Sequence, residues 1–180
     1  IINDGSTDNS LRILERFATE DRRIRLMSRP NTGYAVALNE MLALARAPLV
    51  ARMDADDISL RDRFEKQVEY METHPKCVAV GTGMSVIDDK GRLLYDVPAV
   101  HCSNEEINAT LMRGRSCLVH PSVMMRTNLI RQDGGYRVQY CPAEDYDLWL
   151  RMGERWELAN LSEPLIQYRE HRHSVSSRFA

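Results

Sequence analysis

The sequence predicts an α/β layer fold built on a mostly parallel sheet. In the first half of the 180-residue chain, short apolar runs typical of strands alternate with segments of helical periodicity. Acidic residues directly follow two of the predicted strands, at Asp4 and at Asp54. Because ligands of such sheets bind beyond the carboxyl ends of the strands, we expect the two acids to line one crevice, side by side in one sheet.

The remaining elements follow from periodicity and turn residues. Strands are expected at 1–3, 24–27, 49–53, 77–81, 86–87, 93–95, 122–125, 157–161 and 165–168. Helices are expected at 9–20, 34–45, 60–74, 104–113 and 144–152. Residues 88–91 have the composition of a hairpin turn. Ser59, with Asp62 three residues later, resembles a capping box, and the helix that follows would turn Phe64 and Met71 inward.

The composition is that of an ordinary globular domain. Hydrophobic residues make up 43% of the chain and charged residues 28%, and 180 residues suit a single domain. A net charge of -2 gives no electrostatic basis for a nucleic-acid partner. No apolar run approaches the ~20 residues that span a bilayer, so no transmembrane segment is expected in this chain. The four cysteines form no C-x-x-C pair, which predicts reduced thiols in a cytoplasmic protein.

The stretch 49–57 reads Leu-Val-Ala-Arg-Met-Asp-Ala-Asp-Asp, an apolar strand that ends in three carboxylates. Close like charges repel one another unless a cation neutralises them, and an all-oxygen cluster suits Mg²⁺ or Mn²⁺ together with substrate phosphates. By itself the pattern is as consistent with a solvated acidic turn. A carboxylate at Asp4 that accepts hydrogen bonds from a base or a ribose would favour a nucleoside diphosphate as the ligand.

An ordered set of motifs closely resembles that of family-2 glycosyltransferases, in particular the bacterial branch that builds surface polysaccharides. The set consists of Asp4-Gly-Ser-Thr-Asp8, Asn31-Thr-Gly33 with Ala37-Leu-Asn39, Asp54-Ala-Asp-Asp57, His120-Pro-Ser-Val, Glu144-Asp145 and Tyr168-Arg-Glu-His171. The resemblance covers nearly the whole chain. It implies a GT-A type fold, a three-layer α/β/α sandwich around a mostly parallel mixed sheet. It also implies an inverting, metal-dependent transfer of one sugar from a nucleoside-diphosphate sugar to an acceptor hydroxyl.

The resemblance assigns the nucleotide-sugar side of the site to residues of the first three motifs. Asp4 would hydrogen-bond the nucleotide base, and Asn31 and Gly33 would belong to the nucleotide-sugar-binding residues. Asp54 and Asp56 match the two acids of the D-x-D motif. Asp56 is the expected direct ligand of a Mn²⁺ or Mg²⁺ cofactor, and Asp54 is expected both to contribute to the metal site and to lie nearer the ribose.

Three other positions near this side have two interpretations each. Asp57 either assists the metal through a water molecule or caps the turn. Arg169 has the chemistry to grip a diphosphate, and His171 could complete the metal shell. The alternative for both is a solvated basic tail, which His173 and further arginines would extend.

The acceptor side is assigned to the acidic pair near the end of the chain. An inverting transfer needs a base opposite the leaving diphosphate, and Asp145 is the expected base, with Glu144 orienting the acceptor. The alternative is that both acids only stabilise a helix N-terminus. His120 is expected to be structural, supporting the acceptor pocket at most.

Two departures from the family shape the expectations. The Gln-x-x-Arg-Trp motif of processive synthases is absent, which predicts the transfer of a single sugar. Family members carry a further strand and helix ahead of the position of Ile1, and that strand would lie between the strands at 1–3 and 49–53. We therefore expect a longer native protein, and poor nucleotide binding by this chain alone.

The resemblance also implies the partners. The expected donor is UDP-linked, and the expected acceptor is a saccharide or a lipid-linked saccharide. The acceptor would be reached from the cytoplasm, and a lipid-linked acceptor would need peripheral attachment at the inner membrane face. A nucleotidyltransferase would share the layout and the metal carboxylates, but it should carry a Gly-rich basic loop, which the sequence does not show. A non-catalytic nucleotide-sugar-binding module is the second alternative.

Overall fold

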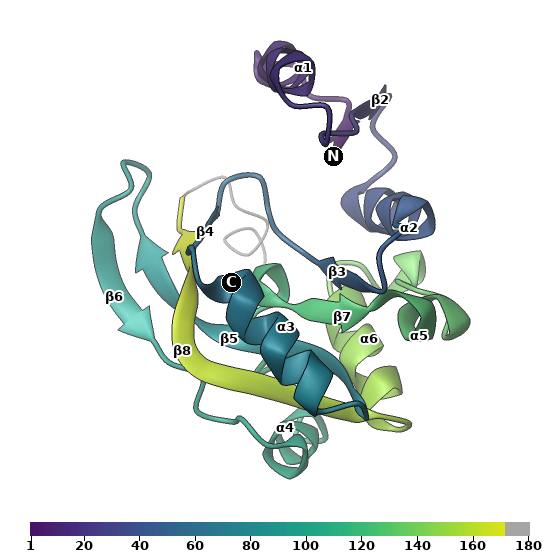
Figure 1. Cartoon of the computed structure of the whole chain (residues 1–180), viewed down its shortest axis with the longest axis vertical. Coiled ribbons are helices and arrows are strands. Elements are labelled where there is room, and N and C mark those ends of the chain that lie inside the picture. Colours follow the sequence, from purple (N-terminus) through teal and green to yellow (C-terminus); the bar gives the residue numbers. More distant parts are fainter. Residues whose placement is uncertain (172–180) are drawn as a thin grey trace.

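Strand β5 (Cys77–Ile87) forms the centre of the larger of two sheets in the computed structural model, which describes residues 1–171 (Figure 1). The sheet has six strands in the order β3-β7-β5-β8-β4, with β6 pairing to β5 off this path. β8 runs parallel to β5 in the longest pairing of the sheet, whereas β6 and β7 are antiparallel to β5. Nearly every residue of β5 is buried, as expected of a strand covered on both faces.

The elements have the following bounds. The strands are β1 (Ile2–Asp4), β2 (Met27–Arg29), β3 (Leu49–Ala51), β4 (Ile58–Ser59), β6 (Leu93–Val97), β7 (Met124–Arg126) and β8 (Glu157–Arg169). The helices are α1 (Ser10–Glu20), α2 (Tyr34–Leu44), α3 (Arg63–Thr73), α4 (Asn104–Leu111), α5 (Thr127–Gln132) and α6 (Glu144–Gly153), with short 3-10 turns at η1 (His120–Ser122) and η2 (Val138–Tyr140).

Helices cover both faces of the large sheet. Figure 1 shows α3 across one face, with α4 and α6 on the other. Neighbouring residues of a strand point to opposite faces, so Leu158 of β8 joins the core beneath α4 and α6, whereas Ala159 joins a smaller core with Met71 of α3. The predicted layered α/β fold is confirmed. No helix within residues 1–171 has the length and apolar character to cross a bilayer.

The second sheet contains only β1 and β2, which pair in parallel. With α1 it stands apart from the large sheet in Figure 1, and its contact with the rest of the chain includes α2. No described strand joins β1 to β3, so the expectation that Asp4 and Asp54 follow strands of one sheet is wrong for residues 1–171. The further strand expected between them stays a prediction.

Several strands differ from their predicted bounds. The strands expected at 77–81 and 86–87 are one strand, β5, and β4 was not predicted. The strand expected at 24–27 is shifted to Met27–Arg29, because its ladder with β1 begins where the Met27 N–H donates to the Ile1 carbonyl. The strands expected at 157–161 and 165–168 are one strand, β8. Pro164 lacks an N–H, and register shifts of β5 at Thr82–Gly83 and Gly83–Met84 accommodate it without ending the strand.

The third helix begins later than the capping box predicts. Ser59 belongs to β4, which pairs with β8, and α3 begins at Arg63 after Asp62, whose side chain makes no capping hydrogen bond. The inward face also differs: Phe64 is 49% exposed, whereas Arg63 and Gln67 are fully buried beside Met71. Helix α5, which the sequence did not predict, follows β7 directly.

The buried polar pair of α3 connects the segment after β3, strand β5 and the turn η1. The Arg63 guanidinium donates to the Arg52 carbonyl at 2.8 Å and to the Gln67 side-chain oxygen at 3.1 Å. The Gln67 amide then donates to the carbonyls of Val80 and Ser122 at 2.7 and 2.9 Å. Polar groups in a core need such partners, so this network fixes the backbone just before the acidic cluster.

Candidate active site

The three carboxylates of Asp54, Asp56 and Asp57 converge at the end of β3. One oxygen from each lies within 4.8 Å of the others. The last hydrogen bond of this strand region to its neighbour is donated by the Arg52 N–H to the Val123 carbonyl, at 2.9 Å. The chain then turns, with the Asp57 N–H 3.4 Å from the Asp54 carbonyl, and this turn gathers the acids on one loop.

Arg52 forms an ion pair with this cluster. Its two terminal nitrogens lie 2.6 and 2.7 Å from the two oxygens of Asp54, a bidentate ion pair. Burial raises the pKa of Asp54, and the Arg52 charge opposes that rise. Arg52 was not among the predicted site residues. The spacing was a usable signal, because residues i and i+2 of an extended chain point the same way.

Asp57 is the buried member of the cluster, only 6% exposed. Its Oδ1 accepts the Arg169 N–H at 2.9 Å, whereas its Oδ2 is buried without a partner among residues 1–171. The Arg169 guanidinium donates to the carbonyls of Asp56 and Asp88 at 2.8 and 2.9 Å, so it ties the acidic loop to the β5–β6 turn. The proposed contact of Arg169 with a diphosphate stays a prediction.

Asp57 should make the stability of the protein depend on pH. Burial, reinforced by Asp54 and Asp56, raises the pKa of Asp57 from 3.8 to about 6. A raised pKa means that the folded state binds the proton more tightly than the unfolded chain. The free energy of unfolding therefore falls as pH rises between these two values, and the loss persists at neutral pH.

Asp57→Asn is expected to raise the free energy of unfolding at neutral pH by about 1–3 kcal/mol. The amide oxygen can still accept the Arg169 N–H, while the buried charge is gone. Urea denaturation in the presence of a chelator measures the effect, and Asp62→Asn, an exposed acid without a capping bond, is the control. A less stable Asp57→Asn protein at neutral pH would contradict the prediction.

The Asp56 carboxylate contacts the segment just after β8. Its Oδ2 lies 2.9 Å from Nε2 of His171, which brings the predicted metal ligands Asp54, Asp56 and His171 to one place. Carboxylate oxygens suit Mn²⁺ or Mg²⁺, and the buried Oδ2 of Asp57, unpartnered among residues 1–171, adds a further oxygen. The residues present therefore fit a divalent cation. His173 lies outside the described residues.

The polar groups of Asp4 bind residues of the turn before α2. Its carboxylate forms an ion pair with Arg29 and accepts the backbone N–H groups of Thr32 and Gly33, each at 3.0 Å. The Asn31 amide donates to the Asp4 carbonyl at 2.8 Å. Asp4, Asn31 and Gly33 thus form one turn, which Gly33 enters with a φ of 98°, in the region that favours glycine. Their binding of a nucleotide stays a prediction.

Glu144 and Asp145 begin α6, as expected of acids at a helix N-terminus. Glu144 is buried, and its Oε2 accepts the Tyr34 hydroxyl at 2.8 Å. Asp145 Oδ1 accepts the Tyr146 N–H at 2.7 Å, and burial followed by the charge of Glu144 raises the Asp145 pKa. Tyr34 was not among the predicted site residues, although it directly follows the Asn31-Thr-Gly33 motif.

Electrostatic coupling joins the acidic cluster to the acceptor-side acids. The charge of Glu144 raises the pKa of Asp54, and the charge of Arg52 lowers that of Asp145. Interactions of this kind require proximity, so Arg52 lies near both groups of carboxylates. The fold thereby brings together motifs that are about half a chain apart in the sequence.

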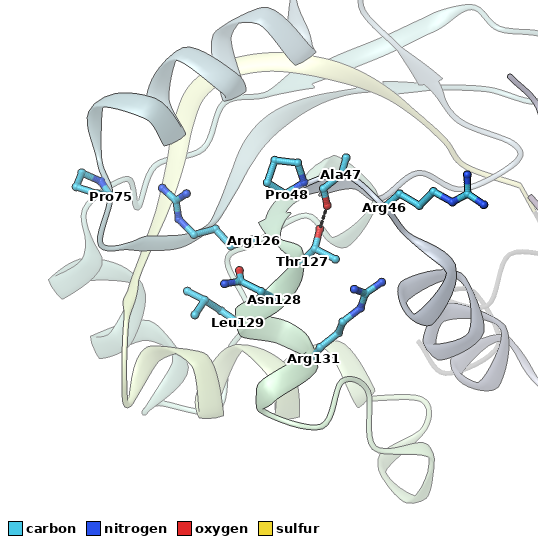
Figure 2. Close-up of a pocket in the computed structure, with 9 residues that line it drawn as sticks. All are labelled: Arg46, Ala47, Pro48, Pro75, Arg126, Thr127, Asn128, Leu129 and Arg131. Carbon is cyan, nitrogen blue, oxygen red and sulfur yellow. Dashed lines mark hydrogen bonds between the residues drawn. The ribbon is translucent and has the colours of Figure 1, made fainter.

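A separate pocket of about 590 Å³ lies between β7, α5 and the segment before β3 (Figure 2). Its lining is Arg46, Ala47, Pro48, Pro75, Arg126, Thr127, Asn128, Leu129 and Arg131. Two of its arginines serve the fold: Arg126 donates to the Met71 and Cys77 carbonyls, and Arg131 to the Leu42 carbonyl. None of the predicted site residues lines this pocket.

Solved structures with this architecture are GT-A glycosyltransferases. Staphylococcus aureus TarS in complex with UDP-GlcNAc superimposes with a TM-score of 0.66 at 18% identity, covering 96% of this chain and 49% of that one. The mannosyltransferase PcManGT from Pyrobaculum calidifontis, in complex with GDP-Man and Mn²⁺, gives 0.67 at 16% identity, covering 99% and 48%. At these identities the likeness shows the fold, which is of the GT-A type.

The chain belongs to glycosyl transferase family 2, whose family model matches residues 1–134. The glycosyltransferase EpsE of Bacillus subtilis is 36% identical, over 94% of this chain and 61% of its own length. The O-antigen biosynthesis glycosyltransferase WbnJ of Escherichia coli is 32% identical, over 97% and 68%. The amylovoran biosynthesis glycosyltransferase AmsE of Erwinia amylovora is 33% identical, over 99% and 66%. The chain thus spans roughly two thirds of these relatives.

Proposed function

We propose that the protein is an inverting, metal-dependent glycosyltransferase that moves one sugar from a nucleoside-diphosphate sugar to an acceptor hydroxyl. The observation that carries the proposal is the convergence of the Asp54, Asp56 and Asp57 carboxylates within 4.8 Å at the end of β3, electrostatically coupled to Glu144 on α6. Membership of the family and relatives named for polysaccharide biosynthesis support it.

The donor side is the acidic cluster. Asp56, Asp54 and His171 would hold Mn²⁺ or Mg²⁺, which when bound neutralises the charge of the leaving diphosphate. Arg52 then holds Asp54 in place through its bidentate pair. Asp4, Asn31 and Gly33 would contact the nucleotide at the turn before α2, and Arg169 would lie beside the diphosphate.

The acceptor side is the start of α6. The acceptor oxygen attacks the anomeric carbon, the bond from that carbon to the diphosphate breaks, and the hydroxyl proton passes to the Asp145 carboxylate. Attack opposite the leaving group inverts the anomeric configuration. Burial raises the pKa of Asp145, which makes the carboxylate a stronger base than an exposed aspartate. Glu144, held by Tyr34, would orient the acceptor.

The partners are proposed from the same reasoning. A UDP-linked sugar is the expected donor, and a saccharide or lipid-linked saccharide of a bacterial surface polysaccharide is the expected acceptor. The absence of the Gln-x-x-Arg-Trp motif supports transfer of a single sugar. A cytoplasmic location, with peripheral contact at the inner membrane face, would bring the enzyme to a lipid-linked acceptor.

A thermal-shift panel tests the donor side. UDP, dTDP and GDP are each added with and without Mn²⁺, and the matching diphosphate is expected to raise Tm only when the metal is present. Stabilisation grows with ligand concentration over Kd and reaches about 2.7 kcal/mol at one hundred times Kd, so the matching base should stand out. Equal effects of all three diphosphates with and without the metal would contradict the proposal.

We also propose that a further strand lies between β1 and β3 in the native protein. The two strands belong to separate sheets, and no described strand pairs with the free edge of either. Repeating the panel on residues 1–180 and on a longer native version compares the two directly. The longer protein is expected to bind the matching diphosphate more tightly, and equal affinity would remove the proposal.

A further inference from the structure

His120 lies next to Asp145, the proposed base. It begins the 3-10 turn η1, and its side chain is only 9% exposed. The ring Nδ1 is 4.0 Å from Oδ2 of Asp145, and the ring Nε2 is 2.9 Å from the Tyr136 hydroxyl. The edge of Trp149, which is on the same helix as Asp145, packs against the ring at a centroid distance of 5.8 Å. The proposed mechanism uses neither His120 nor Tyr136.

The surroundings of His120 select one tautomer. Burial, followed by the charge of Arg52, holds the pKa of His120 well below its ordinary value, so the ring is neutral and carries one N–H. If that proton were on Nε2, the lone pair of Nδ1 would face the Asp145 carboxylate. With the proton on Nδ1, the ring donates toward the carboxylate, and the Tyr136 hydroxyl donates to Nε2.

Hydrogen bonds hold the backbone next to His120 and the backbone of Tyr136 in place. After His120, the Ser122 hydroxyl accepts the Thr82 N–H at 2.9 Å and donates to the Val119 carbonyl at 2.7 Å. The Tyr136 backbone is clamped by Asn39 of α2, whose side chain accepts the Tyr136 N–H at 2.8 Å and donates to its carbonyl at 2.7 Å. This gives a role to Asn39 of the Ala37-Leu-Asn39 motif.

We propose that His120, oriented by Tyr136, is a positioning residue that donates its Nδ1–H to Oδ2 of Asp145 in the working enzyme; this rests on Asp145 being the base. The 4.0 Å separation is too long for a hydrogen bond, but bonds of this kind often tighten only in the reacting complex. Each carboxylate oxygen has two lone pairs, so Oδ2 can accept the ring N–H and still take up the acceptor proton.

Two other charged groups lie near the base, one on its own helix α6 and one just after β3. Glu144 adjoins Asp145 on α6, and Arg52 follows β3. Glu144 raises the pKa of Asp145 and Arg52 lowers it, whereas a donated N–H from His120 would favour the carboxylate. Loss of that N–H should therefore raise the pKa of Asp145, whereas a residue that only fills space would leave it unchanged.

Magnetic resonance tests the tautomer without a substrate. In ¹⁵N-histidine-labelled protein, His120 is expected to be neutral with its proton on Nδ1, and Tyr136→Phe is expected to mix the two tautomers. The phenyl ring preserves the packing while the hydroxyl is removed. A proton on Nε2 in the parent protein would overturn the proposal, as would a tautomer unaffected by Tyr136→Phe.

Carboxyl titration of ¹³C-aspartate-labelled protein, saturated with Mg²⁺ and the matching nucleoside diphosphate, tests the contact with the base, with Asp145 assigned from Asp145→Asn. His120→Leu is expected to raise the pKa of Asp145. His120→Asn, whose amide lies close to the Nδ1 position, is expected to retain most of the parent value. Ile130→Ala, a core substitution on α5 that contributes no polar group, controls for lost stability. A pKa unchanged in His120→Leu overturns the proposal.

Turnover provides the remaining readout. With the donor identified in the nucleotide panel, His120→Leu is expected to lower kcat roughly tenfold at unchanged donor KM, with the acid limb of the pH profile moved to higher pH. His120→Asn should recover most of that loss. If Asp145→Asn is inactive but His120→Leu has the parent pH profile, only the role of His120 fails. If Asp145→Asn is fully active, the assignment of the base fails.

Discussion

Replacing Asp145 by Asn is expected to lower kcat by a factor of about 10²–10⁴, while metal-dependent donor binding remains. The amide is nearly isosteric, and its oxygen can still accept the Tyr146 N–H that holds the parent carboxylate at 2.7 Å. It cannot take up the acceptor proton, so the loss should be in the chemical step. Release of the nucleoside diphosphate at saturating donor measures it.

Glu154→Gln is the matched control for Asp145→Asn. Glu154 is exposed at the other end of the same helix, so this change removes one negative charge without touching the site. Its kcat should match that of the parent protein. Full turnover by Asp145→Asn would show that the base assignment is wrong. Loss of turnover with intact donor binding would exclude the non-catalytic nucleotide-sugar-binding module.

The second large effect is expected at the metal site. Asp56→Asn should weaken Mn²⁺ binding by a factor of about 10–100 and remove the metal-dependent part of nucleotide stabilisation. Asp56 is the acid in contact with His171, and it is less tied to the protein than Asp54, which Arg52 holds, or Asp57, which the Arg169 N–H holds. A carboxylate not committed to such bonds can ligate an ion at lower cost.

Electron paramagnetic resonance of added Mn²⁺ measures the metal affinity directly. Asp62→Asn, at an exposed acid just before α3, is the control and should bind Mn²⁺ like the parent protein. Unchanged Mn²⁺ affinity in Asp56→Asn would exclude Asp56 as a ligand. In that case Asp54 and the buried oxygen of Asp57 would be the remaining acids of the cluster.

Much of the fold was accessible from the sequence because its signals are local. Helical periodicity placed α1, α2, α4 and α6 to within a few residues, and the turn at 88–91 identified the β5–β6 hairpin. The failures have a common cause. The capping box at Ser59 was a sound local pattern, but pairing of β4 with β8 took Ser59 into a strand. On α3, Met71 faces inward as predicted but Phe64 does not, because hydrogen bonds to distant carbonyls allow Arg63 and Gln67 to be buried in its place.

The features of the site also divide into those carried by local sequence motifs and those that depend on contacts between distant residues. Sequence by itself identified the family to which the chain belongs, and the residues proposed to carry the chemistry: the acids at the end of β3 and the acidic pair at the start of α6. Those features reside in short, ordered motifs, whose meaning depends only on neighbouring residues.

Only the tertiary structure decided what each of those groups contacts. It paired Arg52 with Asp54, joined Tyr34 to Glu144, and placed His120 behind Asp145. It also placed Asp4 and Asp54 after strands of separate sheets. Burial and charge at a site depend on side chains brought together from distant parts of the chain, and that proximity exists only once the chain has folded.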